Sequence, residues 1–501
     1  MDIQKVKGTH DVVLSEAEAY EKIEDTMKAI AETFAFRQFR VPVIENSALF
    51  QRSVGESSDI VRKEMYTFLD KGDRSITLRP EFTAGIIRSF VNNKLYATKD
   101  LPVKAYYVGP VFRYERPQLG RYRQFNQFGI ETIGTDNLFH DAEAIILGYQ
   151  ILTCLHLDGV TVKVNTLGDE ESRNNYKEAL KAYFAKHLDN MCPDCKQRYE
   201  LNPLRILDCK VPEDQEIVKD APRMSEYLSD AAKERFDKVL ALLEANNVPY
   251  EIDDTLVRGL DYYSQTVFEF HYTSSKGKDY GAIGAGGHYS NLVKEIGGPS
   301  LEGVGFSFGI ERVYSVLADD GEIDEKGEGL DIYLCPQNKD LVQPCFNLCN
   351  ILRTCGYACE VDIASGKMAT MLKRADRANS KYAIIVGDEE YKTQELTVKN
   401  LTTQAQCKVD LDDIVYYFDA IFNVEEEHCS CGCEDENDSD ECCCGGHHHH
   451  QDGECCCHDH DDEACGCHHN EDSCCCEEKE EDHECCCGHH HHCSDEAKGD
   501  K

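Results

Sequence analysis

The chain has 501 residues, and 93 aspartates and glutamates against 53 lysines and arginines give it a formal net charge of −40. This excess of acid excludes general polyanion binding, so a nucleic acid would need a local basic patch. No apolar run reaches about 18 residues and the N-terminus lacks an apolar signal region. We therefore expect a cytoplasmic protein with no membrane span.

The N-terminal part begins with a predicted helix. It should start at Ser15, because Glu18 three residues later completes a capping box. Apolar residues then recur at helical spacing and predict one buried stripe: Ile23, Met27, Ile30, Ala31 and Phe34. Pro42 interrupts the next extended run, which favours an edge or boundary position for that strand.

Extended and helical segments follow in turn. Residues 106–114 and 125–133 are rich in aromatic and β-branched side chains, so they predict an antiparallel hairpin with a long basic loop. The composition of 170–250 is mostly helical, and 266–270 and 303–308 are expected to be strands. Beyond an acidic, glycine-containing linker, strands and helices alternate, which indicates a small α/β domain.

Charged residues gather on the predicted hairpin. Arg113 and Glu115 are two apart on one strand and so share a face, as do Gln127, Gly129 and Glu131 on the returning strand. The loop adds arginines, which suit bidentate phosphate recognition: Arg116, Arg121 and Arg123. A solvated sheet face and a binding surface explain the first pair equally well.

Three other segments favour a binding surface. They bring further polar side chains: Glu81 and Thr83 on one face of a short strand, Arg258 beside Tyr262 and Tyr263, and Arg312 at the start of a helix behind small residues. The glycine-rich run 281–289 lacks the spacing of the Walker and dinucleotide motifs. It predicts either a backbone wall against a small ligand or a tight sheet corner.

These segments together resemble one enzyme family. FRYERPQLGRYRQFNQFGIETIG resembles the second signature motif of class II histidyl-tRNA synthetases, and GVGFSFGIER resembles the third. LVRGLDYYSQTVFEF and GAIGAGGHYSNLV resemble two segments peculiar to the histidine enzymes. VKGTHDVV, LRPEFTAGIIR and NPLRILDCK are similar to bacterial members, and the resemblance covers residues 6–424.

The resemblance implies an α/β (α+β) architecture, and the whole chain is predicted to have four parts. Residues 1–323 would form a class II catalytic domain with an antiparallel sheet and a helical insertion at 170–250. Residues 324–330 would be a linker and 331–424 an α/β anticodon-binding domain. The fourth part, residues 425–501, lies outside the resemblance, and its low complexity predicts a disordered tail. The enzyme would be a homodimer that uses ATP and Mg²⁺ to join L-histidine to the 3′ end of histidine tRNA, through histidyl-adenylate and with release of pyrophosphate.

It also implies a role for each matching residue. The histidine-binding set would be Glu81, Thr83, Gln127, Glu131, Arg258, Tyr262, Tyr263 and Tyr289, with Glu131 and Tyr289 at the imidazole. The ATP-binding set would be Arg113, Glu115, Arg121 and Arg312. Arg113 and Arg258 would be catalytic, with Arg258 placed where many relatives use a metal ion. The acceptor end of the tRNA would meet Arg116, Gln118 and Arg123.

The chain departs from the family at one motif. The family has Gly-Gly-Arg-Tyr-Asp-Gly where this chain has Gly-Gly-His-Tyr-Ser-Asn at 286–291. The change puts the local support of Tyr289 in doubt, but we expect His288 itself to be an ordinary surface residue.

A basic helix face is predicted in the C-terminal domain. Lys373, Arg377 and Lys381 are four residues apart, with Lys367 and Arg374 nearby. Spacing alone favours a solvated face, whereas the resemblance favours anticodon binding.

Two groups of cysteines raise the question of metal binding. Cys192 and Cys195 form Cys-x-x-Cys, with Cys209 downstream and His187 just upstream. Four such ligands could bind zinc, but the incomplete spacing favours ordinary thiols.

Residues 425–501 hold 18 of the 28 cysteines and 14 of the 20 histidines, with 26 acidic residues and 3 lysines. This density predicts binding of Zn²⁺, Ni²⁺ or Cu⁺ rather than an inert acidic tail. The candidate ligands are Cys442, Cys443, Cys444, His447, His448, Cys455, Cys456, Cys457, Cys474, Cys475, Cys476, Cys485, Cys486 and Cys487.

Two other functions remain as alternatives to the enzyme. An inactive regulatory paralogue would lack the triphosphate-binding arginines and the anticodon domain, and a fused metal-storage protein would carry its metal in the tail.

Overall fold

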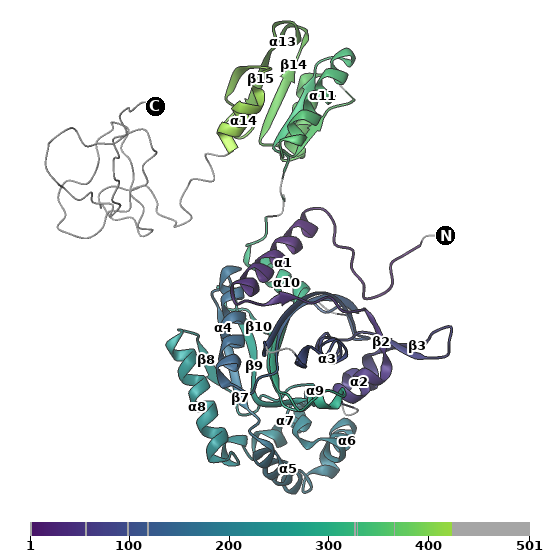
Figure 1. The fold of residues 1–501 in the computed structure, drawn as a ribbon, viewed down its shortest axis with the longest axis vertical. Helices are drawn as coiled ribbons and strands as arrows, with labels where there is room; N and C mark the ends of the chain where they lie inside the picture. Colours follow the sequence, from purple (N-terminus) through teal and green to yellow (C-terminus); the bar gives the residue numbers. More distant parts are fainter. Residues whose placement is uncertain are drawn as a thin grey trace, which may run out of the picture.

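The computed structural model describes residues 3–422, apart from 56–57, 98–99, 118–119, 325–326, 328 and 365. An eight-stranded sheet forms the centre of the N-terminal part (Figure 1). In spatial order its strands are β1 (Arg37–Gln38), β5 (Val103–Phe112), β6 (Gln124–Ile133), β11 (Gly303–Gly309), β10 (Asp279–Tyr289), β9 (Tyr263–Thr273), β7 (Val160–Thr166) and β8 (Tyr250–Ile252). The outermost pair at each edge is parallel, and all other pairs are antiparallel.

The sheet is covered on both faces because successive side chains on its strands point in opposite directions. Tyr106 packs with the larger core on one face and Tyr107 with a second core on the other. The larger core lies under α1 (Ser15–Thr33), α4 (Leu138–Cys154), α8 (Asp230–Ala245) and α10 (Ile310–Asp320). The sheet curves around α3 (Thr83–Asn92), with α9 (Leu292–Glu295) nearby (Figure 1).

Several sequence predictions can be compared with these elements. Ile23, Met27 and Ala31 are buried, so the predicted stripe of α1 is confirmed. The helix begins at Ser15, but its N-cap position is Leu14, and among the described residues no side chain caps its first turn. The predicted capping box is therefore wrong. The hairpin is confirmed as β5 and β6, paired from Val103–Ile133 to Phe112–Gln124.

A small three-stranded sheet extends from one side of the large one. It consists of β2 (Ile44–Asn46), β4 (Ser75–Leu78) and β3 (Tyr66–Leu69), with α2 (Ser47–Ser53) against it. Pro42 lies between the edge strand β1 and β2, in agreement with the predicted boundary.

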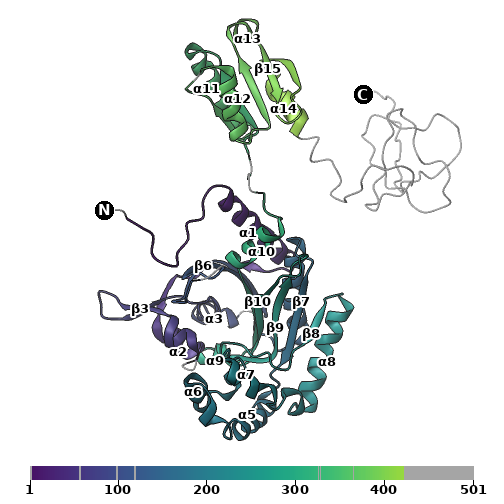
Figure 2. The same ribbon diagram turned by 180° about the vertical axis from the view of Figure 1, so that it is seen from behind.

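The helical insertion has a core of its own. It contains α5 (Glu170–Phe184), α6 (Pro193–Leu201) and α7 (Pro212–Lys219), and α8 ends the segment (Figure 2). Tyr176, Leu180 and Phe184 recur at helical spacing on α5 and are buried in that core.

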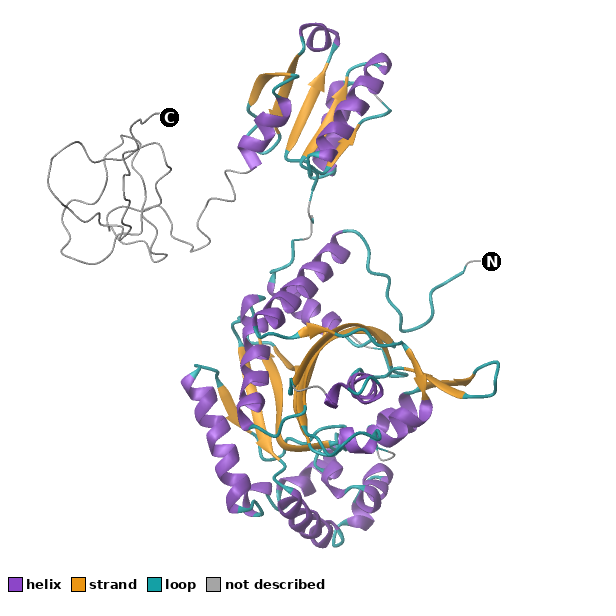
Figure 3. Ribbon diagram, in the orientation of Figure 1, coloured by secondary structure: helices purple, strands orange, loops and turns teal. Residues whose placement is uncertain are grey.

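The C-terminal part alternates strands and helices, as predicted (Figure 3). Its strands in spatial order are β13 (Cys359–Val361), β12 (Ile332–Pro336), β14 (Tyr382–Val386), β15 (Glu395–Asn400) and β16 (Gln406–Asp410). Its helices are α11 (Val342–Thr354), α12 (Met368–Arg377), α13 (Asp388–Thr393) and α14 (Ile414–Phe422). Across the described residues, no helix is both long and apolar enough to cross a membrane.

Candidate active site

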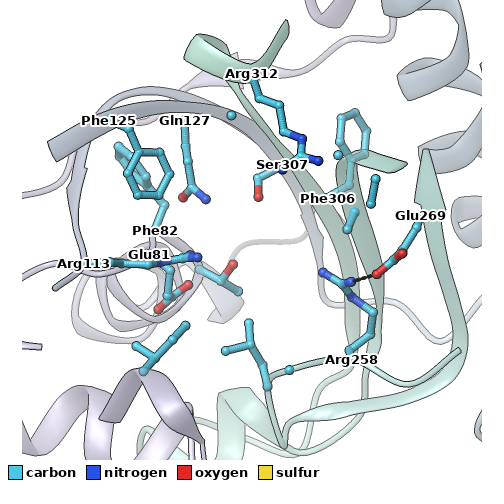
Figure 4. Close-up of a pocket in the computed structure, with 18 of the residues that line it drawn as sticks. Glu81, Phe82, Arg113, Phe125, Gln127, Arg258, Glu269, Phe306, Ser307 and Arg312 are labelled. Carbon is cyan, nitrogen blue, oxygen red and sulfur yellow. Dashed lines mark hydrogen bonds and ion pairs between the residues drawn. The ribbon is translucent and has the colours of Figure 1, made fainter. Parts of the chain in front are cut away.

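A cavity of about 380 Å³ lies on the face of the large sheet that curves around α3 (Figure 4). The residues that line it come mainly from β6, β9, β10 and β11, the starts of α3 and α10, the loop between β5 and β6, and the segment before β9. The lining includes twelve residues singled out from the sequence: Glu81, Thr83, Arg113, Glu115, Arg121, Gln127, Glu131, Arg258, Tyr262, Tyr263, Tyr289 and Arg312. Segments far apart in the chain thus meet around one space.

A buried carboxyl group stands in the wall of this cavity. Glu131 on β6 is 1% exposed. Thr83 Oγ1 donates a hydrogen bond of 2.6 Å to Glu131 Oε1, and the Tyr289 hydroxyl donates one of 3.0 Å to Oε2. Burial raises the pKa of Glu131 to about 8, against the lowering effect of these hydroxyl groups. The raised pKa favours the protonated form of this carboxyl group, which can give its proton to a basic ligand.

The neighbouring strand leaves room for that carboxyl group. A Cβ atom on Gly305 of β11 would lie 2.1 Å from Glu131 Oε2 and 2.4 Å from the Ile130 carbonyl oxygen. Any larger residue at 305 would therefore displace the Glu131 side chain.

Glu81 and Thr83 enter the cavity in a different way from the one predicted. They do not lie on a strand, because β4 ends at Leu78 and α3 begins at Thr83. Glu81 accepts a hydrogen bond of 3.0 Å from the Ala84 backbone nitrogen, in the first turn of α3. The turn before α3 therefore places Glu81 and Thr83 in the cavity, where a shared strand face was predicted to do so. The free N–H groups at the start of a helix attract a carboxylate such as that of Glu81.

Arg113 and Glu115 also lie beyond the strand on which they were predicted, since β5 ends at Phe112. The Arg113 Nε atom donates to the Pro80 carbonyl oxygen at 2.8 Å. Glu115 lies between two guanidinium groups, 3.9 Å from Arg113 and 3.8 Å from Arg121. These contacts join the end of β5 to the turn before α3.

Arginine side chains surround the remaining space. Arg113 and Arg258 point into the cavity from opposite sides (Figure 4). Arg258 pairs with Glu269 on β9, and its Nε atom is buried without a hydrogen-bond partner among the described residues. Arg312 Nη2 donates to the Tyr280 carbonyl oxygen at 2.6 Å, and burial lowers the pKa of Arg312. Several guanidinium groups in one concave site favour a ligand with several negative charges.

The lining residues that the sequence did not predict include Glu269 and Tyr107. Glu269 is the partner of Arg258, and its signal was a single acidic residue in the apolar strand VFEF. Tyr107 lies in the cavity wall, and burial raises its pKa well above the ordinary value. Its signal was the alternation of β5, in which Tyr106 and Tyr107 face opposite sides.

His288 is not a surface residue, and that prediction is wrong. It is 1% exposed and lies between two carboxylates, 2.8 Å from Asp141 and 2.7 Å from Glu302. Asp141 also accepts from Arg235 at 2.8 Å and from Thr266 at 3.0 Å. Burial alone lowers the pKa of His288, but the charge and hydrogen bonds of its acidic partners raise it to about 9. A cation is therefore retained where the family has arginine.

The other predicted residues lie outside the cavity lining or outside the described residues. Arg116 is exposed, and Arg123 stacks 3.8 Å from the centre of the Tyr114 ring. Gln118 and the tail cysteines and histidines from 425 to 501 lie outside the described residues.

The predicted basic face on and after α12 is partly paired with acids. Arg374 bonds Asp362 at 2.8 Å, and Lys381 lies 3.2 Å from Asp331. Lys367, Lys373 and Arg377 are exposed.

The curved, mostly antiparallel sheet, with an arginine-lined cavity beside a buried carboxyl group, has the architecture of a class II aminoacyl-tRNA synthetase. The sequence model of the histidyl-tRNA synthetase family matches residues 8–313, and that of an anticodon-binding domain matches 331–421. The chain therefore belongs to the histidyl-tRNA synthetase family.

Individual relatives agree with this assignment. The histidine–tRNA ligase of Lactiplantibacillus plantarum is 44% identical over 416 residues, which cover 83% of this chain and 98% of the relative. The histidine–tRNA ligase of Lysinibacillus sphaericus is 40% identical, and the match covers 83% of this chain and 99% of the relative. The crystal structure of the apo histidyl-tRNA synthetase of S. aureus matches with a TM-score of 0.72 and 34% identity, and covers 83% of this chain and 100% of that one.

The raised pKa of His288 predicts a pH-dependent contribution to stability. Below the unfolded pKa of 6.5 the histidine is charged in both states and its pairs contribute fully. The contribution falls as pH rises toward the folded pKa of about 9, by a total of about 3 kcal/mol. The difference in thermal midpoint between the native chain and His288→Gln should therefore be largest near pH 6 and small near pH 9.5.

His156→Asn is a matched control, because His156 is exposed and has φ 60°, a conformation that asparagine tolerates. The difference in thermal midpoint between His156→Asn and the native chain should not vary over this pH range. A His288→Gln difference that is equally constant would show that folding does not raise the pKa of His288.

Proposed function

We propose that the cavity is the active site of a histidine–tRNA ligase, where histidine reacts with ATP and the product is transferred to tRNA. The observation that carries the proposal is the meeting, in one cavity, of the buried Glu131–Tyr289–Thr83 group with Arg113 and Arg258. The carboxyl group suits an imidazole, and the guanidinium groups suit a reacting phosphate.

Recognition of the side chain follows from the hydrogen-bond partners of Glu131. An imidazole ring needs one defined partner at each nitrogen. Glu131 can give its proton to one nitrogen and then hold the resulting imidazolium as a carboxylate, while Tyr289 remains bonded to it. An apolar side chain of the same shape would leave this buried group unpaired, so it is rejected. Glu81, Thr83, Gln127, Tyr262 and Tyr263 would hold the amino group and backbone of the amino acid.

Activation is then a matter of charge at phosphorus. The histidine carboxylate oxygen bonds to the α-phosphorus as the bond to the β-phosphate oxygen breaks, giving histidyl-adenylate and pyrophosphate. Negative charge grows on the α-phosphate oxygens, and fixed guanidinium groups stabilise it without reorganisation. Arg113 and Arg258 would supply this stabilisation, since their side chains are held by Pro80 and Glu269.

The remaining charges would bind the rest of ATP. Arg121 and Arg312 would hold the outer phosphates, and Glu115 the adenine side. Glu311 lines the same cavity and offers carboxylate oxygens, the kind of ligand that Mg²⁺ prefers. When bound with ATP, the ion would neutralise part of the charge on the leaving pyrophosphate.

Transfer would use the parts of the chain that bind tRNA. The hydroxyl group at the 3′ end of the tRNA attacks the histidyl carbonyl, and AMP leaves. Arg116 and Arg123, with Gln118, would contact the acceptor end, and residues 331–424 would bind the anticodon through the basic face. Residues 1–323 would be the catalytic domain, joined by 324–330, in a cytoplasmic homodimer.

An inactive regulatory paralogue is the second candidate. It is disfavoured because Arg113, Arg258 and Arg312 all line the cavity and residues 331–421 match an anticodon-binding domain.

The tail is a separate proposal, supported by its 18 cysteines and 14 histidines. Residues 425–501 would bind soft metal ions such as Zn²⁺, Ni²⁺ or Cu⁺. Deletion of these residues should lower the metal bound per chain by several ions, and equal stoichiometry in the two chains would contradict it.

Histidine-dependent exchange of pyrophosphate into ATP tests the proposed function. The native chain should catalyse it, and Arg258→Ala should lower kcat by about 100- to 1,000-fold, because a fixed cation at the developing charge is lost. The exposed Arg52→Ala is the matched control and should retain the native rate. No exchange by a folded native chain would favour the regulatory paralogue.

Glu131→Gln tests the histidine pocket. The amide cannot give a proton to the imidazole or hold its charge, so KM for histidine should rise about 30-fold or more, while KM for ATP changes little. In the native chain, KM for histidine should be lowest between about pH 6.5, the pKa of free imidazole, and the pKa of Glu131 at about 8. Above pH 8 neither Glu131 nor the free imidazole carries the proton that the two groups share in the complex. Binding must then take up a proton from solvent, and KM rises.

The variant should lose this rise above pH 8, since glutamine does not titrate. Glu178→Gln, at an exposed position of α5, is the control. A native KM that stays flat from pH 7 to 9.5 would mean that Glu131 does not share a proton with the ring.

A further inference from the structure

Three cysteines and an aspartate gather in the helical insertion, away from the active-site lining. The thiol groups of Cys192, Cys195 and Cys209 and the carboxylate of Asp214 all lie within 4.8 Å of one another. Cys192 is half-buried and the other three are buried. Cys192 precedes α6, Cys209 follows the short helix Pro203–Ile206, and Asp214 lies in the first turn of α7. Three segments therefore meet at these four side chains.

The spacing of the ligand atoms is close to that of a tetrahedral site. A zinc ion with metal–sulfur bonds of 2.3 Å requires sulfur atoms about 3.8 Å apart. The Cys192 and Cys209 sulfur atoms are 4.0 Å apart, and Cys209 Sγ lies 3.3 Å from Asp214 Oδ2. All four ligand atoms lie within 4.8 Å of one another, so shifts of up to about 1 Å would place them at bonding distance.

Backbone groups already point at the sulfur atoms. The Cys195 N–H donates to Cys192 Sγ at 3.4 Å, and the Val211 N–H donates to Cys209 Sγ at 3.5 Å. The Cys192 N–H donates to Asp214 at 3.1 Å and orients its carboxylate. Hydrogen-bond donors at sulfur stabilise the thiolate, which is the form that binds a metal. Hydrogen bonds to the ligand groups also commonly orient them toward the metal.

A disulfide explains this cluster less well. A bond between Cys192 and Cys209 would use two of the three thiols and leave Cys195 and the buried Asp214 without a role. A cation accounts for all four groups, because it balances the carboxylate together with the thiolates.

We propose that Cys192, Cys195, Cys209 and Asp214 bind one thiophilic divalent cation, for which zinc is the natural choice, as a structural site. The sequence favoured ordinary thiols because the spacing was incomplete, and His187 was only a nearby candidate for the fourth ligand. His187 is not in the cluster, where Asp214 takes the fourth position.

The site would also act on the wall of the active-site cavity. Arg198 and Arg205 lie between Cys195 and Cys209 in the sequence. Their guanidinium groups lie 2.9 Å and 3.9 Å, respectively, from the carboxylate of Asp59. Asp59 and Arg205 line the cavity, and a Cβ on Gly259, next to Arg258, would be 3.9 Å from Arg205 Nη2. A cation that fixes the ends of this segment would hold it against the loop of Arg258.

Site-resolved alkylation of the full chain tests the proposal, since it separates this cluster from the tail thiols. Trypsin releases Cys192 and Cys195 in residues 187–196 and Cys209 in residues 206–210, and neither peptide includes the tail. Labelling with iodoacetamide would be done at the lowest urea concentration at which the metal-free chain reacts completely. Excess Zn²⁺ should slow labelling of both peptides at least tenfold, and a chelator should reverse the effect.

Asp214→Asn should lose most of this protection, whereas Asp220→Asn, an exposed carboxylate after α7, should keep it. Cys154 is exposed on α4 and serves as an internal reference whose labelling should not change. Equal labelling of both peptides with and without Zn²⁺, while the tail thiols of the same sample are protected, would overturn the proposal.

Discussion

The burial of one carboxyl group, that of Glu131, is the constraint around which the histidine side of the cavity is arranged. A carboxyl group removed from water is costly unless hydrogen bonds replace the lost hydration. Thr83 and Tyr289 provide these bonds from α3 and β10, so the sheet and the enclosed helix must meet at this place. Gly305 is part of the same constraint, since any side chain there would occupy the space of the carboxylate.

The position of Tyr289, which bonds Glu131, depends in turn on side chains on the other face of the sheet. Tyr289 and His288 are neighbours on β10, so one side chain points into the cavity and the other points away from it. Behind the sheet, His288 lies between Asp141 and Glu302, and the pair with Asp141 ties the strand to α4. Replacement of the family arginine by histidine keeps a cation between these carboxylates, but makes it dependent on pH. The backbone position of Tyr289 thus depends on charges that the substrate does not contact.

Local pattern was enough to predict the elements but not where each one ends. The aromatic and β-branched runs on both sides of Arg116 predicted the hairpin, because strand alternation is a property of neighbouring residues. Arg113 and Glu115 were assigned to its strand, yet the strand ends at Phe112, where Arg113 bonds a carbonyl group from the turn before α3. That contact joins residues 33 positions apart, which no local pattern reports.

The same distinction explains which functional residues were found. Motif resemblance predicted Arg113, Arg258 and Glu131, since each lies in a segment with its own signature, and all three line the cavity. Burial could not be predicted for His288, because its partners Asp141 and Glu302 lie 147 and 14 residues away in the chain. For Asp214, the Cys-x-x-Cys pair was visible, but its fourth member is a carboxylate that only the packing of α7 against α6 brings to the thiols.

Asp214, like Asp141, occupies a position where a buried charge is tolerated because an opposite charge or a set of donors accompanies it. In both places the ionic group joins elements that apolar packing alone would leave free to shift, since apolar contacts are not directional. Arg205 connects the insertion to the cavity wall, because its side chain lies close to the carboxylate of Asp59. The precise position that the proposed adenylate formation would require of Arg258 would therefore depend on polar contacts outside the reacting centre as well as on the sheet.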